Sequence, residues 1–318
     1  MKKAALSLSL MIAGALVGLV LAEAMLLAIG SVKTQNYATG WAMDDAEARY
    51  VPRPGSYTDI YGSEFVRINA RGLRGPDSEQ ADVLFLGDSC TFGVGVAEAE
   101  AFPGLISAKG VTAANAGVPG YNTTAALARL KSKDLLALKP RAVVLYFGWN
   151  DHWRAAATER TFTHLRPWAA RLRTASVLLR FQESLWRADS FRGRLRLIPQ
   201  VPIEDFKANL EEMIALSRSA GAAAIIVTAA SDPNQIFPSW AYGPDYNRYH
   251  QRYLEAARAV AVKTGVVLVD FAALTERLPG EERTRLFQGP VHLSLAGHQR
   301  LARELIPALA ASGVNFLR

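Results

Sequence analysis

Short apolar segments alternate with longer amphipathic ones from residue 81 to the end of the chain. We predict strands near 83–86, 111–115, 142–147, 222–228 and 266–270. We predict helices near 97–108, 123–137, 204–220, 245–264 and 295–310. Strands that alternate with helices along a chain form a parallel sheet with helices on both faces. The sequence therefore predicts an α/β domain for residues 81–318.

The N-terminus carries a long apolar segment. Residues 4–22 contain no charged side chain, and the apolar run resumes after Glu23 and continues through Ile29. A cleaved signal peptide has an apolar region of about 7 to 15 residues, whereas a membrane-spanning helix needs about 20. The small-x-small pattern at 22–24 fits a cleavage site, but the sequence after it is unusually apolar for a mature N-terminus. We therefore expect an uncleaved transmembrane anchor in residues 1–30, with a signal peptide as the alternative.

The charges that flank this segment predict its orientation. Lys2 and Lys3 precede it, whereas Lys33 is the only basic residue just beyond it, and the acidic pair at 44–45 follows. Positive charge is enriched on the cytoplasmic side of membrane segments. For a bacterial chain, we therefore expect an inner-membrane anchor that places the domain in the periplasm.

Two segments fall outside the alternation of strands and helices. Residues 31–80 form a polar lead-in, which we expect to be a linker or collar between anchor and domain. Residues 152–200 interrupt the alternation, and we expect a basic helical insertion there. Its ten arginines are Arg154, Arg160, Arg166, Arg171, Arg173, Arg180, Arg187, Arg192, Arg194 and Arg196. The insertion could bind an acidic polymer or anionic lipid headgroups. A lid helix around 176–186 with a solvated basic face explains the composition equally well.

Composition excludes several classes of protein. Cys90 is the only cysteine in the sequence, so an intramolecular disulfide and a thiolate metal cluster are both excluded. Stability must therefore come from packing, for which 318 residues, half of them hydrophobic, are sufficient. No nucleic-acid partner is expected, because no recognition motif is present. The oligomeric state is not specified by the sequence.

A serine directly follows the first predicted strand, in the stretch VLFLGDSCTFGVGV at 83–96. The carboxyl end of a strand in an open parallel sheet faces the functional crevice, so Ser89 is either a helix N-cap or a nucleophile. Further motifs lie at corresponding positions: NAGVPGYNT after the second strand, GWND after the third and GPVHLSLAGH before the last helix. Taken singly, Gly120 could be a turn residue, Asn150 a cap and His292 a loop histidine. Together these groups supply a nucleophile, two oxyanion donors and an imidazole, which is what acyl transfer requires.

These motifs resemble those of the SGNH hydrolases, the GDSL-type esterase and lipase superfamily, from residue 83 to about 310. The resemblance implies a flavodoxin-like three-layer α/β/α sandwich. It implies that Ser89 is the nucleophile, with its backbone amide as the first oxyanion donor. The backbone amide of Gly120 and the side-chain amide of Asn150 would be the second and third donors, and His292 the general base. No metal or cofactor is implied.

The last motif departs from the family pattern. The family usually has Asp-x-x-His there, but the residue three before His292 is Gly289. The acid that would orient the imidazole is therefore missing from its usual position. Gln288 is a candidate substitute because it is next to this position and could offer its amide oxygen, and Asp270 and Asp232 are candidates because their carboxylates follow strands at the correct edge of the sheet. A histidine oriented by a backbone carbonyl, or weakened catalysis, would explain the departure equally well.

Other polar residues near the motifs have both functional and structural interpretations. Asp151, His152 and Trp153 follow Asn150, and we expect them to line the substrate pocket, with ordinary loop contacts as the alternative. His298 is expected to be a packing or capping residue of the final helix. Asp88 is expected to hold the serine turn through hydrogen bonds to the backbone, and Cys90 to be a small core side chain rather than a nucleophile.

The expected function combines this chemistry with the expected location. We expect a serine esterase that acts on an acylated component of the cell envelope, with an O-acylated glycan ahead of a lipid. One alternative is an O-acyltransferase that uses the same serine with a sugar hydroxyl as acceptor. The other is a catalytically weakened envelope-binding protein, for which Gly289 is the main argument.

Overall fold

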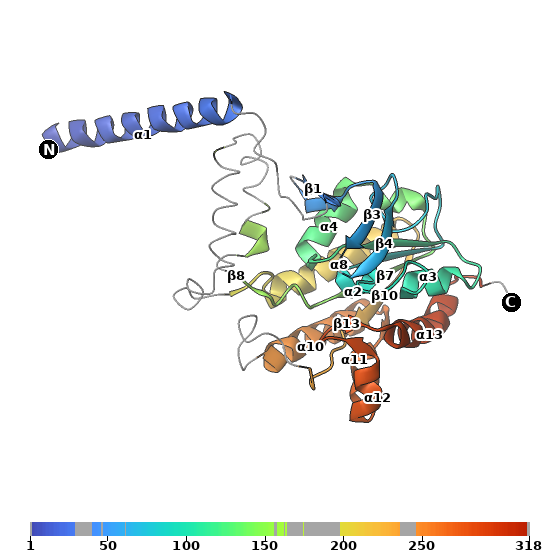
Figure 1. The fold of residues 1–318 in the computed structure, drawn as a ribbon. Coiled ribbons are helices and arrows are strands. Elements are labelled where there is room, and N and C mark those ends of the chain that lie inside the picture. The colour runs from blue at the N-terminus through green and yellow to red at the C-terminus, as the bar shows by residue number, and fades with distance from the viewer. Residues whose placement is uncertain are drawn as a thin grey trace.

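A five-stranded parallel sheet forms the centre of the domain (Figure 1). The computed structural model describes residues 2–28, 40–45, 47–60, 62–155, 158–161, 163, 174, 198–235 and 246–316. The strands are β5 (Val83–Gly87), β6 (Ala113–Gly117), β7 (Ala142–Phe147), β10 (Ala223–Thr228) and β11 (Val267–Val269). Their spatial order is β11-β10-β7-β5-β6, and every neighbouring pair is parallel. Counted along the chain this is 2-1-3-4-5, the flavodoxin-like order. The predicted fold class is confirmed.

Helices cover both faces of the sheet, because the central strands are apolar on both sides. Leu84 and Leu86 contribute to one hydrophobic core, whereas Val83 and Phe85 contribute to the other. The first core is covered by α4 (Thr123–Ser132), α8 (Ile203–Ser219) and α10 (Tyr246–Thr264). The second is covered by α3 (Phe102–Ser107), α11 (Phe271–Glu276) and α13 (Leu295–Ala311). Strands buried on both faces read as continuous apolar runs, which is why the sequence predicted most of them.

The segment expected to be a collar forms two β-hairpins in its described part. They are β1 (Ala42–Asp45) with β2 (Arg49–Pro52), and β3 (Gly55–Ile60) with β4 (Ser63–Ile68). Trp41 and Tyr50 are buried in the same hydrophobic core as α4 and α8. These hairpins therefore pack onto the α/β domain and are part of its folded body.

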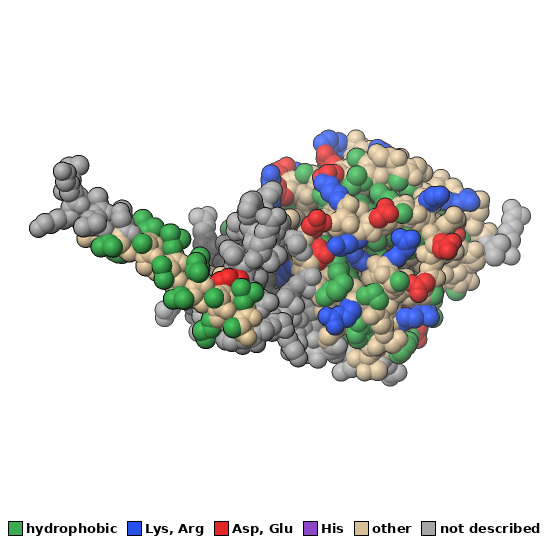
Figure 2. All heavy atoms as spheres, turned by 90° about the horizontal axis from the view of Figure 1, so that it is seen from above, with side chains coloured by type: hydrophobic (Ala, Val, Ile, Leu, Met, Phe, Trp, Pro, Cys, Tyr) green, Lys and Arg blue, Asp and Glu red, His purple; other side chains and the backbone are tan. Residues whose placement is uncertain are grey.

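Helix α1 (Lys2–Ala28) projects from the domain and carries the candidate membrane span (Figures 1 and 2). Its window Leu10–Ala28 has a mean hydropathy of 2.4, and none of it is buried. This length and composition suit a membrane anchor, and a signal sequence has the same properties. Glu23 in this helix accepts hydrogen bonds from the backbone N–H and from Oγ1 of Thr174, both at 2.8 Å.

The ends of the expected insertion lie next to each other. Strand β8 (Arg154–Ala155) pairs antiparallel with β9 (Ile198–Pro199), so the chain leaves and returns at one point of the domain. Most of the predicted basic insertion, including the lid helix expected at 176–186, lies outside the described residues.

Candidate active site

Ser89 and His292 are in direct hydrogen-bond contact, although they are 203 residues apart in the sequence. Ser89 begins α2 (Ser89–Phe92), immediately beyond β5. His292 lies on β13 (His292–Leu293), which pairs antiparallel with β12 (Phe287–Gln288). The distance from Nε2 of His292 to Oγ of Ser89 is 2.9 Å, short enough for the imidazole to take the serine proton. Burial lowers the pKa of His292, which favours the neutral form that a base requires.

Glycines and a carboxylate make the sharp turn at Ser89 possible. A Cβ on Gly87 would lie 1.9 Å from Oγ1 of Thr91, so only glycine fits at the end of β5. Oδ1 of Asp88 accepts a hydrogen bond from the backbone N–H of Cys90 at 2.8 Å and so caps α2. The predicted role of Asp88 in holding the turn is confirmed. Cys90 is buried in the core, as expected.

A buried arginine that the sequence analysis missed anchors the chain just after this turn. Nη1 of Arg74 donates to the carbonyl oxygens of Phe92 and Gly93, and Nη2 donates to that of Val96, all at 2.7 Å. The side chain fixes three carbonyls of the loop that follows the serine helix. No periodic or motif signal marks Arg74 in the sequence, since its partners are 18 to 22 residues away.

Gly120 lies in a tight turn beyond β6. The backbone N–H of Tyr121 donates to the carbonyl of Val118 at 3.1 Å, and φ of Gly120 is +81°. The two central residues of this turn are Pro119 and Gly120. A proline at the first central position and a glycine with positive φ at the second are typical of a type II turn. The backbone N–H of Val118 donates to the carbonyl of Gly87 at 3.1 Å, which brings this turn next to the serine turn.

The side-chain amide of Asn150, beyond β7, lies between these two turns. Its Nδ2 donates to the carbonyl of Tyr121 at 2.9 Å and to Oδ2 of Asp88 at 3.3 Å. Both contacts involve neighbours of predicted site residues, because Tyr121 follows Gly120 and Asp88 precedes Ser89. Burial raises the pKa of Asp88 to about 7. With these two contacts, both hydrogens of the Asn150 amide are engaged.

The structure therefore brings Ser89, Gly120, Asn150 and His292 to one edge of the sheet. The family model of the GDSL-like lipase/acylhydrolase family matches residues 85–300, which is more than half of the chain. The chain belongs to this family. Its family membership makes it a hydrolase that acts on ester bonds.

Solved structures of similar fold include other acylhydrolases. A proposed acylhydrolase from Bacteroides fragilis is 17% identical, with a TM-score of 0.50 over 74% of this chain and 90% of that one. A lipase/acylhydrolase from Enterococcus faecalis is 20% identical, with a TM-score of 0.47 over 75% and 100%. An acetylxylan esterase from Geobacillus stearothermophilus is 17% identical, with a TM-score of 0.45 over 76% and 98%. These likenesses concern the fold alone. No curated protein matches this chain significantly.

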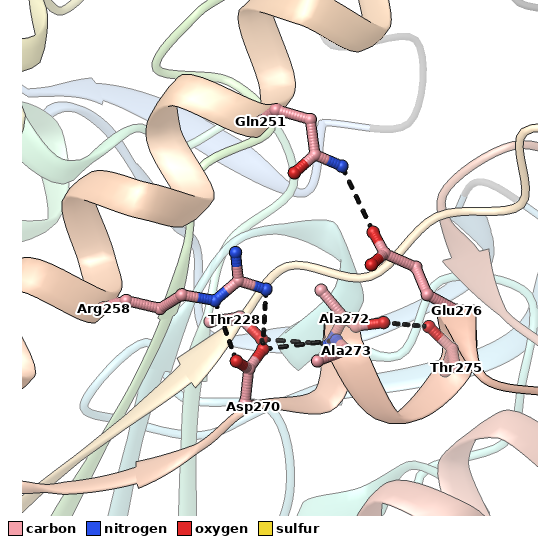
Figure 3. Close-up of polar contacts among 8 residues, drawn as sticks. All are labelled: Thr228, Gln251, Arg258, Asp270, Ala272, Ala273, Thr275 and Glu276. Carbon is pink, nitrogen blue, oxygen red and sulfur yellow. Dashed lines mark hydrogen bonds and ion pairs between the residues drawn. The ribbon is translucent and has the colours of Figure 1, made fainter.

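Asp270 of this GDSL-like hydrolase is engaged by Arg258, Thr228 and the start of α11 (Figure 3). Its carboxylate accepts hydrogen bonds from Nε and Nη2 of Arg258 at 2.8 and 3.1 Å and from Oγ1 of Thr228 at 2.8 Å. It also caps α11 by accepting from the backbone N–H of Ala273 at 3.2 Å. Burial raises the pKa of Asp270, but these bonds outweigh it, and the pKa lies below its usual value. Asp270 is thus a structural ion-pair partner.

The other two candidate substitutes for the acid also have different partners. The carboxylate of Asp232 accepts from the backbone N–H of Asn234 at 3.0 Å and from Nε2 of Gln235 at 3.1 Å. Nε2 of Gln288 donates to the carbonyls of Val94 and Leu293 at 2.6 and 2.9 Å.

The hypothesis of a substitute acceptor at these three positions is therefore not supported. Within the described ranges, neither Asp232, Asp270 nor Gln288 is hydrogen-bonded to His292, and no other described residue is hydrogen-bonded to its Nδ1. The backbone N–H of Asp232 donates to the carbonyl of Pro290, two residues before His292, at 2.9 Å. Its side chain nevertheless turns to Asn234 and Gln235. Sequence position alone could not decide this, because it does not specify which way a carboxylate points.

Two of the three residues expected to line the pocket are buried instead. Asp151 is 0% exposed and holds the start of α4, because its Oδ1 accepts from both the backbone N–H and Oγ1 of Thr123. His152 is 1% exposed, and its Nε2 lies 3.1 Å from Nδ1 of His250. Their burial favours the alternative of ordinary structural contacts, and their contact with substrate stays a prediction. Trp153 is half-buried and remains a candidate.

His298 is a packing residue, as predicted. It is buried in α13, and its Nδ1 accepts a hydrogen bond from the backbone N–H of Phe102 at 3.2 Å. Burial lowers the pKa of His298 to about 3, so the ring is neutral and suited to this contact.

We expect Gly289→Asp to raise kcat at least tenfold, because it restores a carboxylate at the position where the family has one. In the described part of the chain, Nδ1 of His292 has no hydrogen-bond partner that such a carboxylate would have to replace. A Cβ at Gly289 meets no atom within 4 Å, so space is available. The φ of +79° there costs about 1 kcal/mol of stability for a non-glycine residue, and Asp and Asn tolerate it best. Gly289→Asn is the matched control, since it has the same shape and strain but no charge. Equal kcat values for the two variants would contradict the prediction.

Proposed function

We propose that the chain is a serine esterase in which Ser89 attacks an acyl ester and His292 is the general base. The observation that carries this proposal is the 2.9 Å contact between Nε2 of His292 and Oγ of Ser89. Oγ forms a bond to the acyl carbon while Nε2 takes the hydroxyl proton and passes it to the departing alkoxide, which leaves as the alcohol. Water, deprotonated by the same base, then attacks the acyl-enzyme and releases the acid together with Ser89.

The tetrahedral intermediates need donors for their negative oxygen. The proposed donors are the backbone amides of Ser89 and Gly120 and the side-chain amide of Asn150. In a site that excludes water, removal of one such donor costs about 2.7 to 4 kcal/mol. The hydrogen bond from Asn150 to the carbonyl of Tyr121 supports this assignment, because it orients the amide. The second amide hydrogen would exchange its longer contact with Asp88, at 3.3 Å, for the oxyanion.

The pH dependence should follow the protonation of His292. The base works when neutral, and burial lowers its pKa below the ordinary 6.5. We therefore expect kcat/KM to remain high down to a midpoint below pH 6.5 and to fall at more acid pH. Gly289→Asp should move that midpoint to higher pH, because a carboxylate stabilises the imidazolium. A midpoint that does not change in Gly289→Asp would show that another group causes the fall in kcat/KM at acid pH. Asp88 is such a group, because burial raises its pKa to about 7.

The proposed substrate is an acylated component of the cell envelope, with an O-acylated glycan ahead of a lipid. Support comes from the apolar window of α1 and from Lys2 and Lys3 before it, which together favour an inner-membrane anchor and a periplasmic domain. The same serine could pass its acyl group to a sugar hydroxyl. The envelope-binding alternative is favoured by the lack of a described partner for Nδ1 of His292.

A membrane-impermeant fluorophosphonate probe tests both the nucleophile and the orientation. The full chain is expressed in a bacterium, and spheroplasts are labelled before and after lysis, with Ser89→Ala as the control. We expect equal labelling of the parent before and after lysis and none of Ser89→Ala. Labelling that requires lysis would overturn the orientation. Absence of labelling in lysed cells would overturn the nucleophile and favour the binding protein.

Acyl release from purified chain in detergent then distinguishes the substrates. An O-acetylated polysaccharide should release acetate at a rate that depends on Ser89, and a phospholipid should release fatty acid more slowly. Addition of a de-acetylated sugar acceptor distinguishes hydrolysis from transfer. Acetylated acceptor that accumulates at the expense of free acetate would favour the acyltransferase.

A further inference from the structure

Tyr50 reaches the turn that contains Gly120 from outside the segment matched by the family. It lies on β2 of the first hairpin, whereas the family match begins at residue 85. Its hydroxyl donates a hydrogen bond to the carbonyl of Pro119, and the hydroxyl of Tyr121 donates to the carbonyl of Tyr50. The two rings pack edge to face, with centroids 5.3 Å apart. Both residues are buried, at 5% and 1% exposure, so these contacts are shielded from water.

The carbonyl that Tyr50 holds belongs to the same peptide plane as the N–H of Gly120. In a trans peptide the C=O and the following N–H point in opposite directions. The type II turn at 118–121 differs from a type I turn by a flip of this central peptide, and the flip would carry the N–H of Gly120 to the opposite side. A hydrogen bond from Tyr50 to Pro119 therefore fixes the direction of the Gly120 N–H.

Two further contacts tie Tyr50 to the same place. A Cβ on Gly120 would lie 2.6 Å from the Tyr50 hydroxyl oxygen, so the phenol occupies the space beside the turn. The carbonyl of Tyr121 accepts the hydrogen bond from Nδ2 of Asn150 at 2.9 Å. The backbone amide of Gly120 and the side-chain amide of Asn150, the second and third proposed oxyanion donors, thus both depend on the turn that Tyr50 contacts.

We propose that Tyr50 is a positioning residue for the oxyanion hole, and that it acts by holding the Pro119–Gly120 peptide with the N–H toward the reacting carbonyl. The proposal rests on the esterase function assigned to Ser89. It makes the β1–β2 hairpin part of the catalytic apparatus. Neither Tyr50 nor its partner carbonyl touches substrate in this scheme.

The test is Tyr50→Phe in the full chain, which removes one hydroxyl and keeps the buried ring. We expect kcat for a p-nitrophenyl ester to fall about tenfold, with KM changed less than threefold, because the interaction matters chiefly in the transition state. A boronic acid inhibitor that mimics the tetrahedral intermediate should lose affinity by the same factor. Tyr57→Phe is the matched control, since that hydroxyl on β3 donates to the carbonyl of Arg53 in the connection between the two hairpins, and we expect no change in kcat.

Amide hydrogen exchange of the peptide at 118–122 supplies a readout that does not need turnover. We expect faster exchange there in Tyr50→Phe, with the exchange of β7 unchanged. Parental kcat and boronate affinity in Tyr50→Phe would overturn the positioning role while leaving the esterase proposal intact. If the parent itself shows no turnover that depends on Ser89, the esterase proposal fails, and unchanged exchange at 118–122 would separately overturn the role of Tyr50.

Discussion

Ser89→Ala should lower kcat for short p-nitrophenyl esters by about 70-fold. In a serine protease with a complete triad, loss of the serine costs about 2 × 10⁶ in kcat and loss of the acid alone about 3 × 10⁴. These losses do not add, because the residues act as one unit. No described residue is hydrogen-bonded to Nδ1 of His292. We therefore expect kcat of the parent to be that of a serine–histidine pair without the acid. The rate decrease still expected from Ser89→Ala is therefore the ratio of the two losses, about 70-fold.

The size of this loss is as informative as its sign. Ser217→Ala is the matched control, because Ser217 is a buried serine of α8 whose hydroxyl donates to the carbonyl of Met213. We expect parental turnover in the control and similar thermal unfolding in both variants. A loss near 10⁶-fold would show that an acceptor orients His292 in solution. An unchanged rate in Ser89→Ala would remove Ser89 as the nucleophile.

Asn150→Ala should lower kcat by about 10² to 10³, the usual cost of one oxyanion-hole donor. The hydrogen bond to the carbonyl of Tyr121 orients the amide, and the hydrogen that contacts Oδ2 of Asp88 at 3.3 Å is the one that turns to the oxyanion. The negative oxygen exists only in the tetrahedral intermediate and the transition states that flank it. We therefore expect KM to change much less than kcat, as measured by steady-state kinetics.

Asn209→Ala provides the comparison for this prediction. Nδ2 of Asn209 donates to the hydroxyls of Thr123 and Thr124 at 3.0 Å, in contacts between α8 and α4. The control loses an asparagine amide without touching Ser89 or His292, and its kcat should stay within threefold of the parent. A decrease of kcat in Asn150→Ala no larger than in this control would exclude the amide as an oxyanion donor.

The sheet was predictable from the sequence where its strands are strongly apolar. β5 and β7 match the predicted segments closely, because every residue in them is buried. β6 begins two residues later than predicted, at Ala113, because its residues AANAG give little hydrophobic signal. Small residues are needed there, since a Cβ on Gly117 would lie 2.3 Å from the backbone nitrogen of Phe92. Pairing of Val83 with Ala113 sets the register, and that is a tertiary contact.

The helices were predictable where they are long. The segments expected at 204–220, 245–264 and 295–310 correspond to α8, α10 and α13 within one residue at each end. The helix expected at 97–108 is shorter, because α3 begins only at Phe102, with Pro103 in its first turn. The six-residue helices α11 and α12 (Gly280–Arg285) were missed, since a short helix has too few residues to show a periodic pattern.

His292 was assigned from its motif before the last helix. The sequence by itself also determined the α/β class, the apolar N-terminal helix and the strand ends beyond which Ser89, Gly120 and Asn150 lie. These features follow from local patterns, because a buried strand and the turn after it occupy consecutive residues. Only the tertiary structure decided that the carboxylates of Asp270 and Asp232 bind groups other than His292. It also decided that Tyr50 donates a hydrogen bond to Pro119, 69 residues further along. Such contacts depend on which way side chains point after distant segments pack, and no local pattern encodes that direction.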